Sequence, residues 1–168
     1  MGYAEAVATI HAQVEMVWDT LNDIDNTHRW VMGLERAEIT TTGACGVGTV
    51  YHDYNRLGPA LQVTAWNVAV FEPMTRQVHV SDSTTLPSKM VIVMAARAEG
   101  TRVRMSVEYR FMPQWGRFSR VFETLVMNHV LSSVLRQNLG RLNAYLRPVA
   151  SAFEPIESEE GIHDLQHN

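Results

Sequence analysis

The segment TRVRMSVEYRFM, residues 101–112, alternates apolar and polar side chains with a period of two. Successive side chains of a β-strand point to opposite faces, so this alternation predicts a strand with one buried face and one face in water. Pro113 follows at once, and beyond it the apolar spacing changes to 3.6 residues as far as Arg147-Pro148. The chain is therefore expected to pass from sheet to helix here. The residues predicted to share the buried face of the strand are Val103, Met105, Val107, Tyr109 and Phe111.

The segments before residue 101 are predicted to be mostly strands as well. Residues 3–11 form a first strand candidate, and the apolar residues of 14–21 have the i, i+3, i+4, i+7 spacing of an amphipathic helix. A second short helix would carry Trp30. Turn-forming residues separate the remaining strand candidates, which are 34–41, 48–56, 61–72, 75–82 and 88–98.

This order of elements predicts an α+β helix-grip fold. A curved antiparallel sheet of about seven strands would wrap around one long C-terminal helix, with two short helices after the first strand. Residues 1–150 are expected to form a single domain. Residues 151–168 are acidic and lack periodicity, so we expect a disordered tail.

Composition argues against several classes of function. The 168 residues carry a net charge of −4 without a block of Lys and Arg, which argues against nucleic acid as the partner. No stretch is apolar enough to span a membrane, and no signal peptide is visible, so a cytoplasmic location is expected. Cys45 is the single cysteine and is interpreted as a small turn residue rather than a nucleophile. The histidines lack metal-ligand spacing, so neither a metal nor another cofactor is expected, and a homodimer is left open.

Four segments resemble the polyketide cyclase/dehydrase branch of the START-like (SRPBCC, birch-pollen-allergen-like) superfamily. They are AQVEMVWDTLNDIDNTHRW at 12–30, GVGTVY at 46–51, LQVTAWNVAVFEP at 61–73 and EGTRVRMSVEY at 99–109. The resemblance implies an apolar cavity between sheet and long helix that holds a hydrophobic small molecule. Aromatase/cyclase members use an arginine from a mid-sheet strand, and residues 61–71 contain no arginine. That catalytic residue is therefore not carried over.

Polar residues interrupt the apolar stripe of the long helix. Asn128 and Ser132 lie on the same stripe as five leucines, and His129 lies at its flank on the side of Phe122. A buried polar group without a partner costs about 1–3 kcal/mol, so each must find one. Either a ligand or water supplies that partner, or Asn128 bonds to a strand and Ser132 to a helical carbonyl.

The strand after Gly48 carries the candidate catalytic groups. By similarity to an aromatic-then-acidic pair of the family, Tyr51 and Asp53 are expected to point inward. Burial would raise the pKa of Asp53 toward neutrality, which suits a general base. The alternative is a solvated aspartate on an edge strand. His79 lies on the more polar face of its strand and is predicted to be exposed.

Large apolar side chains would line the cavity or simply form the core. The thioethers of methionine suit a pocket that must adapt to an irregular ligand. Two tryptophans would gate the mouth or pack the floor. The full set of predicted ligand-binding residues is Trp30, Trp66, Met90, Met94, Met105, Tyr109, Phe122, His129 and Ser132.

Two functions follow as hypotheses. In the first, the chain is a cofactor-independent cyclase/dehydratase for a hydrophobic, polyketide-derived molecule, with Asp53 as the base. Tyr51, Tyr109 and Asn128 would donate hydrogen bonds to the developing oxyanion. In the second, the chain is a non-catalytic carrier or sensor of a hydrophobic small molecule.

Overall fold

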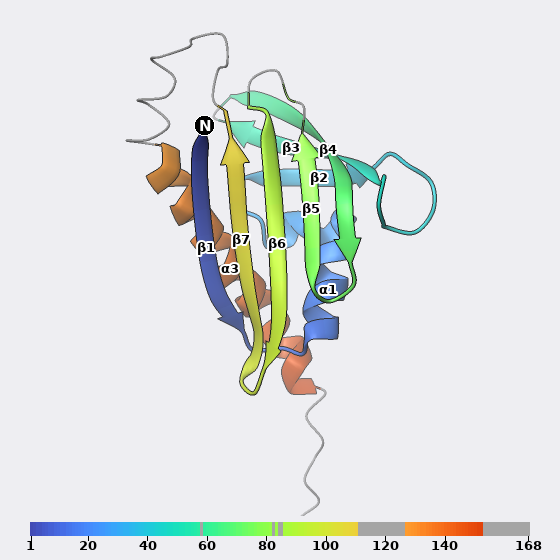
Figure 1. The fold of residues 1–168 in the computed structure, drawn as a ribbon, viewed down its shortest axis with the longest axis vertical. Coiled ribbons are helices and arrows are strands. Elements are labelled where there is room, and N and C mark those ends of the chain that lie inside the picture. Colours follow the sequence, from blue (N-terminus) through green and yellow to red (C-terminus); the bar gives the residue numbers. More distant parts are fainter. Residues whose placement is uncertain (58, 82, 84–85, 111–126, 153–168) are drawn as a thin grey trace, which may run out of the picture.

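The computed structural model describes residues 1–57, 59–81, 83, 86–110 and 127–152, and Figure 1 shows their arrangement. Strands and helices follow one another in the order that the sequence predicts. They are β1 (Gly2–Ile10), α1 (Val14–Asn22), the 3-10 helix η1 (Ile24–Arg29), β2 (Leu34–Ile39), β3 (Val50–Leu57), β4 (Ala60–Glu72), β5 (Arg76–Ser81), β6 (Ser88–Arg97), β7 (Gly100–Tyr109) and α3 (Asn128–Ala152).

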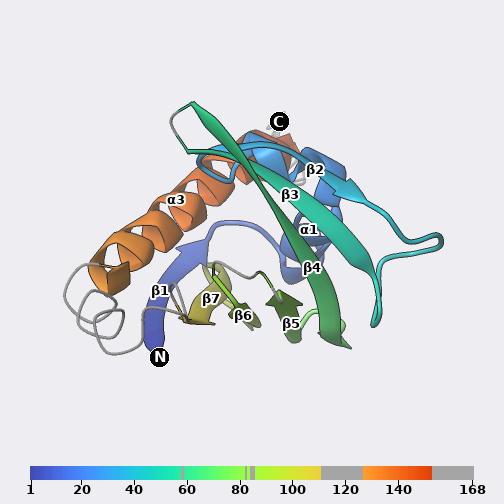
Figure 2. The same ribbon diagram turned by 90° about the horizontal axis from the view of Figure 1, so that it is seen from above.

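The described strands form one seven-stranded sheet in the order β1-β7-β6-β5-β4-β3-β2, with every neighbouring pair antiparallel. Strands β2 and β3 and the first part of β4 run across the direction of β1, β7 and β6, so the sheet is strongly curved (Figures 1 and 2). Side chains of α1 and α3 share one core with β1, β6 and β7. The predicted helix-grip fold is confirmed.

The leucine stripe of α3 supplies much of this core. Leu139, Leu142 and Leu146 are almost completely buried and pack in one cluster with Ile10 and Val103 of the sheet. Burial of each such side chain stabilises the fold by roughly 1.5–3 kcal/mol. This part of the space between helix and sheet is filled by protein side chains.

Two asparagines of α3 fasten it along β1, which is an edge strand. Asn128 Oδ1 accepts the backbone N–H of Tyr3 at 3.1 Å, and Asn143 Oδ1 accepts that of His11 at 2.9 Å. The two N–H groups are eight residues apart on an extended chain, about 26 Å, and the asparagines are fifteen residues apart on a helix, about 22 Å. The matching lengths let the helix run beside the strand and cover part of its unpaired edge.

A third asparagine holds the turn between η1 and β2. Asn138 is buried, and its Oδ1 accepts the backbone N–H of Met32 at 2.9 Å. This bond ties α3 to the segment that carries Trp30, although the two lie more than a hundred residues apart in the sequence.

The C-terminal boundary of α3 differs from its prediction. The helix was expected to end at Arg147-Pro148, yet it continues through Pro148 to Ala152. Proline lacks the N–H that would bond the carbonyl of Ala144, and Ala144 is exposed, so water can serve that carbonyl instead. The first two residues of the predicted tail belong to α3, and the others lie outside the described residues, as does the predicted start of the long helix.

We expect Leu142→Ala to lower the free energy of unfolding by about 2–5 kcal/mol, because it leaves a cavity in the packed core. Leu61→Ala is the matched control, since Leu61 is 50% exposed and its change should stay within about 0.5 kcal/mol. Urea unfolding followed by circular dichroism measures both. Equal effects of the two substitutions would contradict the packing described here.

Candidate functional site

The inner face of β3 and β4 carries the candidate catalytic groups. Tyr51 and Asp53 lie two residues apart on β3 and therefore share a face. Trp66 of β4 is paired with Tyr51, and Thr64 is paired with Asp53, so both lie on that face too. Tyr51 is only 4% exposed and belongs to a second apolar cluster formed by η1 and strands β2 to β4. The expected inward direction of Tyr51 agrees with this burial.

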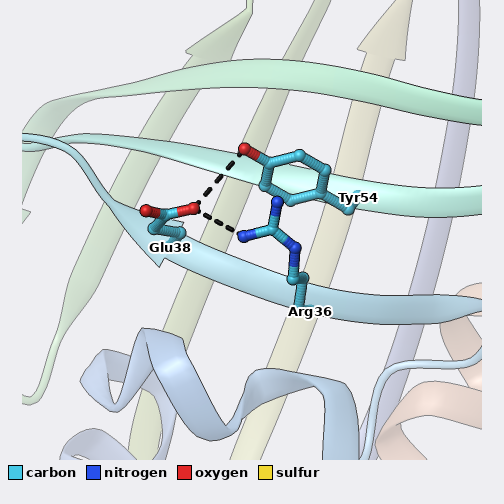
Figure 3. A network of polar contacts seen from close by, with 3 residues as sticks. All are labelled: Arg36, Glu38 and Tyr54. Carbon is cyan, nitrogen blue, oxygen red and sulfur yellow. Dashed lines mark hydrogen bonds and ion pairs between the residues drawn. The ribbon is translucent and has the colours of Figure 1, made fainter.

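The opposite face of the same strands carries an exposed polar network. Arg36 Nη1 donates to Glu38 Oε2 at 2.6 Å, and its guanidinium lies 3.5 Å from the centre of the Tyr54 ring (Figure 3). Exposed ion pairs of this kind contribute little to stability. The network fixes Tyr54 on the outer face, which leaves its neighbour Asp53 on the inner face.

Asp53 combines burial with an unsatisfied oxygen. Its Oδ1 is buried and has no hydrogen-bond partner among the described residues. Burial raises the pKa of this carboxyl to about 7, and a hydrogen bond with the Trp66 side chain opposes the rise. A carboxyl with this pKa holds and releases a proton with equal ease near neutral pH, as acid–base chemistry requires.

A buried chain of hydrogen bonds runs from Tyr51 to α1. The Tyr51 hydroxyl and His79 Nδ1 are 2.9 Å apart, and His79 Nε2 lies 3.1 Å from Gln77 Oε1. Gln77 Nε2 then donates to Asn22 Oδ1 at 2.8 Å. The chain joins β3, β5 and the last residue of α1. It could not be predicted from the sequence, because bonded members such as Asn22 and Gln77 are 55 residues apart.

The prediction that His79 is exposed is wrong. His79 is 3% exposed, and Gln77 and Ser81 on the same face of β5 are buried as well. Their partners on β6 include Ile92, a residue of the main core, so this polar face of β5 is its inner face. Hydrogen bonds within the protein make such burial tolerable.

Burial sets the protonation of both ring systems in this chain. It lowers the pKa of His79 to about 4, so the imidazole is neutral at pH 7. It also raises the pKa of Tyr51 well above its ordinary value, with the nearby charge of Asp53 acting in the same direction. Neither side chain is charged at neutral pH.

Cys45 lies beside the end of this chain of hydrogen bonds. Its thiol is 3.7 Å from Asn22 Oδ1, in the turn region before β3. Burial raises the pKa of the Cys45 thiol, which disfavours the reactive thiolate. This environment agrees with the interpretation of Cys45 as a structural turn residue.

The Asn128 oxygen is hydrogen-bonded to Tyr109. The Tyr109 hydroxyl donates to Asn128 Oδ1 at 2.7 Å, and Asn128 also accepts the N–H of Tyr3. Tyr109 is almost fully buried. The hydroxyl proton that was predicted to face an oxyanion is thus directed at the helix. The arrangement corresponds to the structural alternative for Asn128, in which the amide bonds to a strand.

The other predicted ligand-binding residues fall in different environments. Met94 and Met105 are buried in the main core, and Met90 is half-buried against it. Trp30 is also buried in that core, and its Nε1 is a buried donor without a partner among the described residues. Of the remaining residues, Trp66 and Ser132 are half-buried, His129 is exposed, and Phe122 lies outside the described residues.

The chain matches a known protein family over residues 1–147. The family described as "Polyketide cyclase / dehydrase and lipid transport" matches residues 1–147. The chain belongs to this family. Proteins of this polyketide cyclase/dehydrase family are associated with small hydrophobic ligands. No curated protein sequence matches the chain.

Solved structures share the fold of this family member at low sequence identity. TTHA0849 from Thermus thermophilus has a TM-score of 0.66 and 18% identity over 85% of this chain and 98% of its own. The di-domain ARO/CYC StfQ from the steffimycin biosynthetic pathway has a TM-score of 0.71 and 13% identity, over 89% of this chain and 51% of its own. Ara h 8.0201 has a TM-score of 0.65 and 12% identity, over 87% and 97%. At these identities the likeness concerns the fold alone.

Two further observations concern the described part of this family member. No helix there is long and apolar enough to cross a membrane. Nor does that part of the chain hold a group of three or more His, Cys, Asp and Glu side chains arranged to bind a metal ion.

The raised pKa of Asp53 predicts a pH-dependent effect of Asp53→Asn on stability. Between the ordinary pKa of 3.8 and about 7, the folded protein keeps a proton that the unfolded chain releases. The contribution of Asp53 to the free energy of unfolding is therefore fully present below pH 3.8 and is lost as the pH rises through about 7. The variant should therefore become more stable relative to wild type as pH rises from about 4 to 8. Urea unfolding across this range measures the difference. Asp19→Asn, at an exposed position of α1, should follow the wild-type curve.

The lowered pKa of His79 predicts the opposite trend. The unfolded chain binds the proton below the ordinary pKa of 6.5, whereas the folded protein resists it down to about 4, so stability is lost as pH falls through this window. His79→Gln should remove this loss, while His129→Gln at an exposed position of α3 should not. The same unfolding series tests it. A His79→Gln curve parallel to wild type between about pH 4 and 6.5 would contradict the burial effect.

Proposed function

We propose that the chain is a cyclase/dehydratase-type enzyme that binds a hydrophobic, polyketide-derived small molecule on the inner face of β3 and β4. Membership of the polyketide cyclase/dehydrase family supports this class of reaction. The observation that carries the proposal is Asp53, whose carboxyl has a pKa of about 7 and a buried oxygen without a protein partner among the described residues. A purely structural aspartate would have both oxygens hydrogen-bonded.

We propose that the two buried unpartnered atoms of the described residues contact the same bound molecule, Trp30 from the main core and Asp53 from the inner face of β3. Asp53 Oδ1 is an acceptor when ionised, and Trp30 Nε1–H is a donor. Leaving either group unsatisfied costs about 1–3 kcal/mol, which a bound molecule would recover. A substrate with a carbonyl oxygen for Trp30 and an acidic C–H or hydroxyl for Asp53 would satisfy both. Keto and hydroxyl groups close together on an apolar skeleton meet this demand.

The proposed chemistry uses one carboxyl as base and then as acid. Ionised Asp53 takes a proton from the carbon next to a substrate carbonyl, and the electron pair moves onto the carbonyl oxygen, where Trp30 Nε1–H stabilises it. The neutral carboxyl then returns the proton to a hydroxyl at the β position. Water leaves as the C=C bond forms, and the carbonyl is restored. In a cyclisation the same enolate carbon attacks a second carbonyl of the folded chain, and the alkoxide that forms takes its proton from the neutral carboxyl of Asp53.

Tyr51, Tyr109 and Asn128 take no direct role in this version of the reaction. The Tyr51 and Tyr109 hydroxyls are hydrogen-bonded within the protein, to His79 and to Asn128, and the Asn128 oxygen anchors α3 to β1 and β7. In this proposal the Trp30 indole N–H, rather than these three residues, stabilises the oxyanion. Tyr51 still forms part of the site because it shares a strand face with Asp53.

A non-catalytic carrier or sensor is the second candidate function. It is favoured by the same pairing of Tyr109 with Asn128, which leaves few polar groups for chemistry. Binding needs only a shaped apolar surface with a few orienting groups, and Asp53 with Trp30 would supply these.

We expect Asp53→Asn to reduce product formation from a poly-β-ketone acyl thioester by about 100-fold or more, while binding of the thioester changes little. The amide keeps the size of the carboxyl but cannot take the proton. Mass spectrometry of the dehydrated or cyclised product measures turnover, and Asp19→Asn is the matched control. Unchanged turnover in Asp53→Asn would falsify the assignment of the base. Binding by wild type with full recovery of the intact thioester would favour the carrier.

A further inference from the structure

The chain of hydrogen bonds behind Tyr51 has a direction. It starts at a backbone carbonyl, that of Trp18 in α1, which lies 2.7 Å from the Asn22 side chain. A carbonyl oxygen only accepts hydrogen bonds, so the Asn22 atom that faces it must be the amide nitrogen. The other end of the Asn22 amide, its oxygen, then faces Gln77.

The next two side chains, Gln77 and His79, are oriented in the same way. Because the Asn22 oxygen can only accept, Gln77 presents its nitrogen to Asn22 and its oxygen to His79. The Gln77 oxygen also only accepts, so His79 Nε2 must carry the hydrogen. A neutral imidazole has one N–H, and His79 Nδ1 is therefore the bare acceptor.

The Tyr51 hydroxyl ends the chain and takes its orientation from it. With His79 Nδ1 bare, the hydrogen of the Tyr51 hydroxyl points at that nitrogen over 2.9 Å. The lone pairs of the Tyr51 oxygen remain for any other group that approaches. The buried Oδ1 of Asp53, on the same strand face, is also an acceptor when the carboxyl is ionised. Two acceptors thus lie on one inner face of β3.

We propose that the Trp18 carbonyl, acting through this chain, fixes Tyr51 as an acceptor toward bound molecules, and that the site selects ligands with a hydroxyl or N–H at this point. The inference rests on the proposed function, in so far as ligands bind on the inner face of β3. Tyr51 is then a specificity-determining residue, and Asn22, Gln77 and His79 are positioning residues that act through it. A carbonyl oxygen placed against Tyr51 would meet lone pairs and be rejected.

The first test needs no ligand. Nitrogen-15 spectra of the imidazoles at neutral pH should show His79 with Nε2 protonated and Nδ1 bare, its signals being identified by their loss in His79→Gln. Asn22→Leu removes the side chain that is oriented by the Trp18 carbonyl, so Gln77 is free to turn and the Nδ1–H tautomer should appear. Asn67→Leu, at an exposed position of β4, should leave the tautomer unchanged. A wild-type Nδ1–H tautomer, or no change in Asn22→Leu, overturns the proposal.

The second test compares two probes of nearly the same shape. The naphthalene alcohol 1-naphthol donates a hydrogen bond, and its methyl ether, 1-methoxynaphthalene, does not. We expect wild type to bind the alcohol about five-fold more tightly, which is about 1 kcal/mol for one neutral hydrogen bond. The His79 nitrogen signals should shift with the alcohol and not with the ether. In Tyr51→Phe the preference should disappear.

The other possible results of the binding test also decide whether the site selects hydrogen-bond donors. Equal affinities, a preference for the ether, or binding of neither probe up to its solubility overturns the selection of donors. The His79 shifts keep the test decisive if Tyr51→Phe does not fold. Preference for the alcohol together with no turnover of the thioester supports this inference while it contradicts the proposed enzyme, so the two failures are distinguishable.

Discussion

The attachment of α3 along the edge strand β1 is the constraint on which the remaining structure depends. Leucines of the helix fill one half of the interior, and the carboxamides of Asn128 and Asn143 hold the helix parallel to the strand. A helix placed there seals the core at β1, β6 and β7. It leaves the inner face of β3 to β5 to be completed by the second apolar cluster and by buried polar side chains of β3 and β5.

The buried polar side chains of β5 are hydrogen-bonded within the protein. Gln77 and His79 are almost completely buried, yet each has partners on both sides. Asp53 Oδ1 and Trp30 Nε1 differ from these groups, because each is a buried polar atom without a partner among the described residues. Both the proposed reaction and the proposed ligand preference start from this contrast between satisfied and unsatisfied groups.

The fold was predictable from the sequence because periodicity fixes which residues share a face of a strand or helix. Periodicity does not say which face is buried, and for this reason the polar face of β5 with His79 was placed outside. The partners of Asn128 and Gln77 depend on contacts between distant segments, which no local pattern contains. The inward direction of Tyr51 came from family similarity. A cytoplasmic location and the question of a homodimer stay predictions.

The bonds between β1 and α3 also have a kinetic consequence. The backbone N–H groups of Tyr3 and His11 donate to asparagine side chains that lie 125 and 132 residues further along the chain. During synthesis on the ribosome, the first strand therefore emerges long before the helix that covers its edge. Loops of this length close slowly, and an uncovered strand edge in the meantime invites pairing with other nascent chains. The edge of β1 is thus covered only after α3 has been synthesised.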